Sequence, residues 1–179
     1  MLFFMQLSKK VPFDDPMVLN GVRAAYALSN LIIFGIYLYV RNKIEAKKDR
    51  TTLKYVEPPQ PGSSEEKLIT TTVYAYDVLQ LKSLYKSQLM GLGMMAVMHL
   101  YFKFSSPLMV QSVIPLKSVF EGNLVKIHLL GEPATGDLER PWKANSGLAG
   151  LMTGGGEIKK DKKSIETAEK SGKGGAKED

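Results

Sequence analysis

The sequence predicts an all-α integral membrane protein with two or three short transmembrane helices, a cytosolic helical stem and a disordered basic C-terminal tail. Three observations lead to this prediction. Residues 24–40 carry no charge, residues 87–102 form a second uncharged stretch between two lysines, and the last 26 residues or so are rich in glycine and charge. The first two patterns are typical of membrane helices. The third is typical of chain that cannot bury enough apolar surface to fold.

The composition of the 179-residue chain narrows the functional classes. A net charge of +6 indicates an acidic partner such as anionic lipid or nucleic acid. The absence of cysteine excludes disulfides, thiol catalysis and zinc–thiolate sites. The sequence also contains no phosphate loop, H-E-x-x-H or G-x-S-x-G motif. We therefore expect no enzymatic activity, no metal and no cofactor.

The first predicted span covers residues 17–40 and follows an apolar N-terminal stub at residues 1–7. At about 1.5 Å per residue, its uncharged part forms about 25 Å of helix, and extension back to residue 17 reaches the ~30 Å hydrocarbon thickness. Pro16 and the aspartates before it favour a helix start. Basic residues after the span outnumber those before it, which places the following loop in the cytosol.

The second predicted span follows a basic loop and a proline-rich linker at residues 41–76. A short extended element is expected near residues 68–74. Asp77 can cap a helix that runs over residues 77–104, first as a cytosolic stem and then as a span. The uncharged part of this helix is about 24 Å long, so flanking lysines are expected to extend to the headgroups.

Residues 107–130 combine one apolar helical face with a polar remainder, and Pro115 is expected to kink them. They are predicted either to lie at the interface or to span with their polar side against protein or water. Residues 1–131 thus form the predicted membrane domain. Residues 132–179 form a cytosolic loop and a flexible basic tail, with a short helix near residues 164–170.

Polar side chains in these segments are candidates for a hydrophilic groove. Asn20, Arg23 and Asn30 share one helix face, and an intramembrane arginine is costly and usually functional. The alternative is that Arg23 extends to the headgroups while Asn30 bonds a neighbouring helix. The later segments contribute further polar candidates: His99, Gln111, Lys117 and Glu121.

Three methionines, Met90, Met94 and Met98, recur at helical spacing. Methionine is flexible and polarisable, and surfaces that bind varied apolar partners are rich in it. The alternative is ordinary lipid contact or helix packing.

Two basic clusters are candidates for contact with ribosomal RNA or anionic lipid, and the alternative is ordinary solvated charge on the cytosolic side. Their residues are Arg41, Lys43, Lys47, Lys48 and Arg50 in the loop, and Lys159, Lys160, Lys162 and Lys163 in the tail.

Several stretches resemble one fungal family of endoplasmic reticulum membrane proteins. They are TTLKYVEP (51–58), MHLYFKF (98–104), PLMVQSVIPLKSVFEGNLVKIHLLG (107–131), PATGDLERPWK (133–143) and DKKSIETAE (161–169). The family is SRP-independent targeting protein 3, also described as inorganic phosphate transport protein 88. Its members have a longer apolar N-terminus than residues 1–7, so that segment is expected to be truncated.

The resemblance implies SRP-independent targeting and membrane insertion of proteins at the endoplasmic reticulum. The partners it implies are the Sec translocon, the ribosome, other membrane subunits of the pathway, newly made membrane proteins and the bilayer. The groove residues and methionines would then bind the client protein. A multi-pass topology is expected, with the loop at residues 41–86 and the tail in the cytosol. The alternatives are a phosphate transporter or a factor for maturation of one, and a passive scaffold of the translocon.

Overall fold

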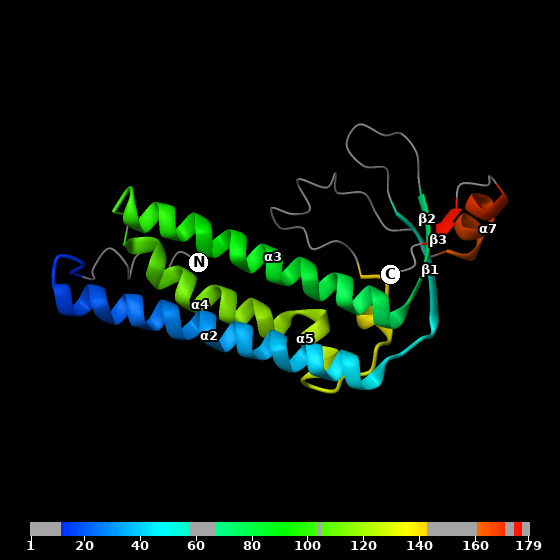
Figure 1. Ribbon diagram of the computed structural model, residues 1–179, viewed down its shortest axis with the longest axis horizontal. Helices are drawn as coiled ribbons and strands as arrows, with labels where there is room; N and C mark the ends of the chain where they lie inside the picture. Colours follow the sequence, from blue (N-terminus) through cyan, green and yellow to red (C-terminus); the bar gives the residue numbers. More distant parts are fainter. Residues whose placement is uncertain (1–11, 58–66, 104, 143–160, 171–173, 177–179) are drawn as a thin grey trace. The chain divides into compact units, whose positions relative to one another are not determined.

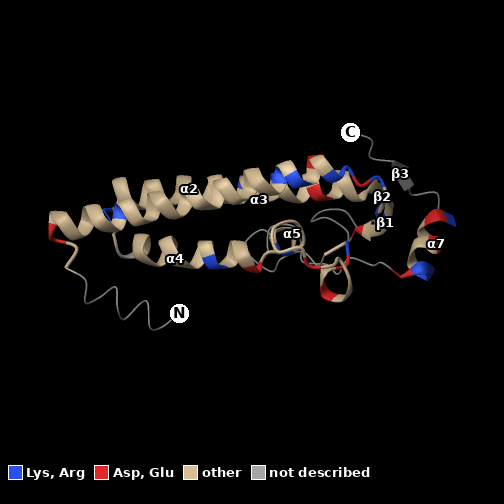
Figure 2. Ribbon diagram, turned by 90° about the horizontal axis from the view of Figure 1, so that it is seen from below, with Lys and Arg blue, Asp and Glu red and all other residues tan. Residues whose placement is uncertain are grey.

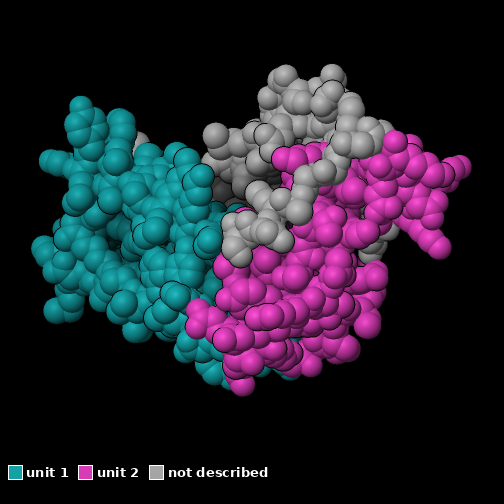
Figure 3. All heavy atoms as spheres, turned by 45° about the vertical axis from the view of Figure 1, so that its right-hand side comes forward, with its two compact units in different colours: residues 1–42, 81–130 teal, residues 43–80, 131–179 magenta. Residues whose placement is uncertain are grey.

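A computed structural model of the chain describes residues 12–57, 67–103, 105–142, 161–170 and 174–176. The chain forms two compact units (Figure 3). Unit 1 comprises residues 1–42 and 81–130, and unit 2 comprises residues 43–80 and 131–179. The predicted stub at residues 1–7, most of the linker and the lysines at positions 159 and 160 lie outside the described residues.

Unit 1 is built from helices that lie side by side (Figure 1). They are parts of α2 (Pro16–Lys47) and α3 (Val73–Leu100), followed by α4 (Ser106–Glu121) and α5 (Asn123–His128). The start of α2 is capped, because the Asp15 carboxylate accepts a hydrogen bond from the Met17 N–H at 2.8 Å.

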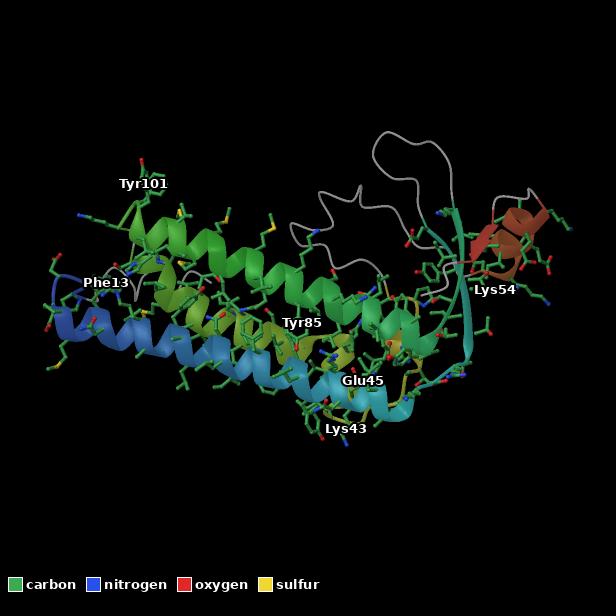
Figure 4. The ribbon with its side chains drawn as sticks, viewed as in Figure 1. Phe13, Lys43, Glu45, Lys54, Tyr85 and Tyr101 are labelled. Atoms are coloured by element: carbon green, nitrogen blue, oxygen red, sulfur yellow. The ribbon has the colours of Figure 1, made fainter. Side chains whose placement is uncertain are left out.

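The core of unit 1 contains one face of α2, with Ile33, Tyr37 and Val40 buried. Their spacing of four and three residues is that of a helical stripe. The ring of Tyr85 on α3 packs edge-on against Tyr37, with 5.3 Å between ring centroids (Figure 4). It also stacks on Phe34 at 6.0 Å. These aromatic contacts hold α2 against α3.

The opposite side of α2 is apolar and exposed, with Leu28, Leu31 and Leu38 pointing outward. Figure 2 shows a long uncharged stretch of this helix. Within the described residues, α2 alone is long and apolar enough to cross a membrane. Only 22% of its most apolar 18-residue window is buried, whereas a core helix of a soluble protein is mostly buried. This exposure fits a helix that faces lipid.

The prediction of two or three transmembrane helices is wrong for the part of the chain that the structure describes, where only α2 qualifies. In α3 the polar residues Gln88 and His99 interrupt the apolar stretch. Residues 107–130 do not form one helix, because Gly122 takes an extended conformation (φ −65°, ψ 135°) between α4 and α5. Pro115 lies inside α4.

Unit 2 contains a small β-sheet, so the all-α prediction is also wrong. Strand β1 (Thr52–Glu57) pairs antiparallel with β2 (Lys67–Thr72), and β3 (Gly174–Ala176) pairs parallel with β2. β-Branched and aromatic residues favour these strands. The extended element expected near residues 68–74 is confirmed as β2, although α3 already begins at Val73 and not at Asp77. Strand β1 is not part of the sequence prediction, which places residues 52–57 in the basic loop.

The two faces of the β1–β2 pair contact different helices. Tyr55 and its cross-strand partner Ile69 face the first turns of α3, where Tyr55 packs edge-on against Tyr76 at 5.8 Å. On the other face, Lys54 makes an ion pair of 2.8 Å with Glu169 of α7 (Lys162–Lys170). The short helix expected near residues 164–170 is therefore confirmed. The tail predicted as disordered contributes both α7 and β3 to unit 2.

Candidate functional site

The predicted groove residues Asn20, Arg23 and His99 meet at one end of unit 1. The Arg23 Nε donates a hydrogen bond to His99 Nε2 at 2.9 Å, and its Nη1 donates to Asn20 Oδ1 at 3.3 Å. Arg23 and Asn20 are exposed, and His99 is half-buried. Spacing on α2 predicted the first pair, whereas the contribution of His99 from α3 comes from the fold.

Asn30 forms a separate, buried contact in the middle of the same helices. Its Oδ1 accepts a hydrogen bond from Gln88 Nε2 at 2.6 Å, and its Nδ2 donates to the Tyr26 carbonyl at 2.8 Å. On the neighbouring side of α2, the Ser29 hydroxyl donates to the Ser112 carbonyl of α4. Such side chains join helices where no water is available.

In the structure Asn30 bonds a neighbouring helix, through the Gln88 side chain of α3. Sequence reasoning missed both Gln88, which bonds Asn30, and Ser29, which bonds the Ser112 carbonyl of α4. The available signal was their polarity within otherwise apolar segments, which marks helix–helix contacts in membranes.

The methionines point away from these polar contacts. Met94 has 66% of its surface exposed, and Met90 is similarly exposed on the same face of α3. Met98 is half-buried, and Met95, the neighbour of Met94, is only 6% exposed. Leu89 and Val97 extend the exposed apolar surface. The predicted groove is therefore divided into separate parts: an exposed polar cluster around Arg23, a buried contact at Asn30, and an outer apolar surface. We call the last part the α3 apolar surface (Leu89, Met90, Met94 and Val97).

The remaining polar candidates lie on the surface of α4. Lys117 and Glu121 form an exposed i, i+4 ion pair at 3.4 Å, and Gln111 is exposed as well. An exposed pair of this kind contributes at most about 1 kcal/mol to stability. Among the described contacts, none joins these residues to Arg23 or Asn30.

The basic candidates of the loop occupy the end of α2 and the residues after it. Arg41, Lys43, Lys47, Lys48 and Arg50 are all exposed. Figure 4 labels Lys43 and Glu45 on this last part of α2. Positive charge at a helix C-terminus is favourable, because the helix dipole is negative there. In the tail, the predicted lysines at positions 162 and 163 begin α7 and are exposed.

Unit 2 contains a buried ionic site that the sequence did not predict. The Asp77 and Arg140 side chains are 3% and 10% exposed, and Arg140 Nε lies 2.6 Å from Asp77 Oδ1. Trp142 completes the site. Its backbone N–H donates to the Tyr76 hydroxyl at 2.8 Å, and the centroid of its ring lies 5.3 Å from the Arg140 guanidinium carbon. The sequence predicts Asp77 as a helix cap. Arg140 follows it by 63 residues, which is too far for any periodicity to connect the two.

Burial dominates the electrostatics of this site. It raises the pKa of Tyr76 to about 12, although the hydrogen bond from the Trp142 N–H acts in the opposite direction. Burial also raises the pKa of Tyr55, with a smaller contribution from the negative charge of Glu57. Both tyrosines line a small open cleft beside the sheet. The bidentate ion pair between Arg140 and Asp77 attaches residues 136–142 to the start of α3, so we assign it a role in stability.

Comparison with known proteins gives consistent matches along the chain. A family model described as Phosphate transport (Pho88) matches residues 1–176. SRP-independent targeting protein 3 of Saccharomyces cerevisiae is 49% identical over 178 residues, which cover 99% of this chain and 94% of that protein. An SRP-independent targeting protein 3 homolog of Schizosaccharomyces pombe is 38% identical over 170 residues, covering 94% and 86%. No solved structure matches the chain.

Proposed function

The chain belongs to the Phosphate transport (Pho88) family, as its sequence predicted, and from that premise we propose that it acts in SRP-independent targeting of proteins to the endoplasmic reticulum membrane. Two relatives carry SRP-independent targeting in their names. The exposed apolar helix α2 is compatible with association with that membrane. These observations support a role at the membrane in which other proteins are the substrates.

The observation that carries the proposal further is the α3 apolar surface. Its methionines adapt their shape to different apolar partners, as a targeting factor with varied clients requires. A contiguous exposed apolar surface marks a site of contact with lipid or with another protein. We assign it to the apolar segment of the client.

The internal polar contacts support this surface. The Asn30–Gln88 hydrogen bond joins α2 to α3, and the Ser29–Ser112 bond joins α2 to α4. A surface carried by connected helices loses less conformational entropy when a client binds. Asn30 therefore acts as a structural support in this proposal and does not touch the client.

The basic residues at the end of α2 are proposed to hold the chain on an anionic surface. Ribosomal RNA and the headgroups of the cytosolic leaflet both attract exposed lysine and arginine clusters. The Sec translocon and the other membrane subunits of the pathway are the proposed recipients of the client. Added salt is expected to weaken contact through this cluster, because exposed charges are screened.

Replacement of the two exposed methionines tests the client-binding role. Met90→Gln combined with Met94→Gln is expected to reduce insertion of a client with a central hydrophobic segment into microsomes, because glutamine cannot replace the lost apolar contact. Ser118→Ala, on the exposed surface of α4 and outside every candidate set, is the control and is expected to leave insertion unchanged. Full insertion by the double variant would contradict the role of this surface.

A second candidate is phosphate transport, which the description of the matching family names. The exposed cation Arg23 is the feature of unit 1 that favours it. Phosphate flux into proteoliposomes that contain only this chain would support it. A passive scaffold is the third possibility. It differs from the proposed targeting factor in that no client contacts the α3 apolar surface.

A further inference from the structure

Arg23 is held in place by two uncharged groups. Its Nε and Nη1 donate to His99 and Asn20, at 2.9 Å and 3.3 Å. In this arrangement the His99 Nε2 and the Asn20 Oδ1 are the acceptors of the guanidinium N–H groups. The Asp15 carboxylate, eight residues before Arg23, accepts a hydrogen bond from the Met17 N–H. Within the described residues, no ion pair to Arg23 is found, so its charge is oriented but not neutralised.

The same end of unit 1 exposes large apolar side chains. Met17, Tyr101 and Leu100 are the most exposed of the large apolar residues described in the unit, and Phe102 is exposed as well. Figure 4 shows Tyr101 projecting outward from the end of α3. The rings of Tyr101 and Phe102 pack edge-on at 5.1 Å. Aromatic residues in such a position are typical of the boundary between hydrocarbon and headgroups.

The position of Arg23 along α2 agrees with that boundary. It follows Pro16 by seven residues, which places it about 10 Å from the start of the helix at about 1.5 Å per residue. An arginine side chain at this depth reaches the headgroups while its aliphatic part stays in apolar surroundings. The guanidinium group pairs well with phosphate oxygens, because its N–H groups match their geometry.

We propose that Arg23, positioned by Asn20 and His99, binds the phosphate group of a phospholipid whose acyl chains lie against the exposed apolar residues of this end. The site goes beyond the proposed targeting function and does not depend on it, since it shares no residue with the α3 apolar surface. A phospholipid satisfies both the cation and its apolar surroundings. Free inorganic phosphate would pair with the cation but would leave these apolar side chains exposed to water.

Native mass spectrometry of the full chain in detergent micelles tests the proposal, with phosphatidylinositol as the added lipid. Arg23→Gln is expected to weaken binding about tenfold, since one charge-assisted contact is lost. Arg23→Lys is expected to be intermediate, because it keeps the charge but cannot hold both partners. Lys82→Gln is the matched control: it removes an exposed charge from α3 in the same unit and is expected to change affinity by less than about twofold.

Three results would overturn the proposal: Arg23→Gln binding as tightly as the unmodified chain, equal losses in Arg23→Gln and Lys82→Gln, or displacement of the lipid by the same concentration of inorganic phosphate. The last result would identify a free-phosphate site. If Arg23→Gln does not fold by circular dichroism, His99→Phe supplies the test. It keeps the cation but removes its acceptor, and about threefold weaker binding is expected. Unchanged binding by His99→Phe would then contradict the proposed positioning.

Discussion

The Arg140 guanidinium holds the Asp77 carboxylate with two parallel hydrogen bonds, Nε to Oδ1 at 2.6 Å and Nη2 to Oδ2 at 2.7 Å. The two residues are 63 positions apart in the sequence. Asp77 is buried and the Arg140 side chain is only 10% exposed, so water has little access to the pair. The pair therefore fastens the segment that contains η1 (Gly136–Leu138) and Trp142 to the first turn of α3.

Loss of one partner from this pair is expected to destabilise unit 2. Arg140→Ala leaves a buried carboxylate without its cation, and we expect the free energy of unfolding to fall by about 3 kcal/mol. Trp142 is the only tryptophan of the chain, so its fluorescence during denaturant unfolding reports on unit 2 directly.

The exposed ion pair of the same unit is the control. Lys54 and Glu169 are each nearly half exposed, and Lys54→Ala is expected to cost less than about 1 kcal/mol. Equal losses in Arg140→Ala and Lys54→Ala would show that burial of the Asp77 pair contributes nothing.

The buried tyrosines predict a loss of stability at alkaline pH. The pKa of Tyr76 rises from 10.0 to about 12 in the folded chain, so folding favours its neutral form. This contribution is fully present below pH 10 and is lost as the pH rises from 10 toward 12. Tyr55 acts in the same direction. We expect Trp142 fluorescence to report earlier unfolding by denaturant across this range.

Tyr76→Phe separates this effect from general alkaline damage. The variant loses the acceptor of the Trp142 N–H and is expected to be less stable at neutral pH by about 1 kcal/mol or more. Its further loss above pH 10 is expected to be smaller than that of the unmodified chain. An identical alkaline loss in both proteins would exclude Tyr76 as its source.

The Asn30–Gln88 hydrogen bond predicts a coupled response to substitution. Asn30→Leu leaves the Gln88 amide without its acceptor and is expected to lower stability by about 1–2 kcal/mol. The double variant with Gln88→Leu is expected to recover most of that loss, because both polar partners are then removed. Denaturation of the chain in detergent, followed by helical circular dichroism, measures the cycle.

Client insertion by the same double variant shows whether Asn30 supports the helices or itself binds the client. Since Asn30 does not touch the client in our proposal, restored stability is expected to restore insertion. Losses that simply add between the two single variants would show that the side chains are not coupled.

The helices were largely predictable because their signal is local. The charge-free stretch of α2 identified the helix, but hydropathy did not show its end, since Arg41 and the residues up to Lys47 continue it in a polar environment. Arginine, lysine, glutamate and alanine are good helix formers, so the helix continues beyond its apolar part to Lys47.

The sheet and the ionic site were not predictable, because they depend on partners distant in the sequence. Nothing in the local pattern of β1 identifies β2 as its partner across residues 58–66. Likewise, no spacing connects Asp77 to Arg140. Periodicity showed that Met90 and Met94 share a face, but not that this face points outward. The exposure of this face follows from the fold, because α2 contacts α3 through other residues, namely Tyr85, Gln88 and His99.

The most direct measurement uses two adjacent methionines with opposite exposure. A photo-crosslinking residue is placed at Met94, 66% exposed, or at Met95, 6% exposed, and a client with a central hydrophobic segment is translated on microsomes. The account predicts a client adduct from position 94 that disappears when the client segment is made polar, and little or none from position 95. Adducts from position 94 to translocon subunits alone, with no client, would contradict it and favour a scaffold.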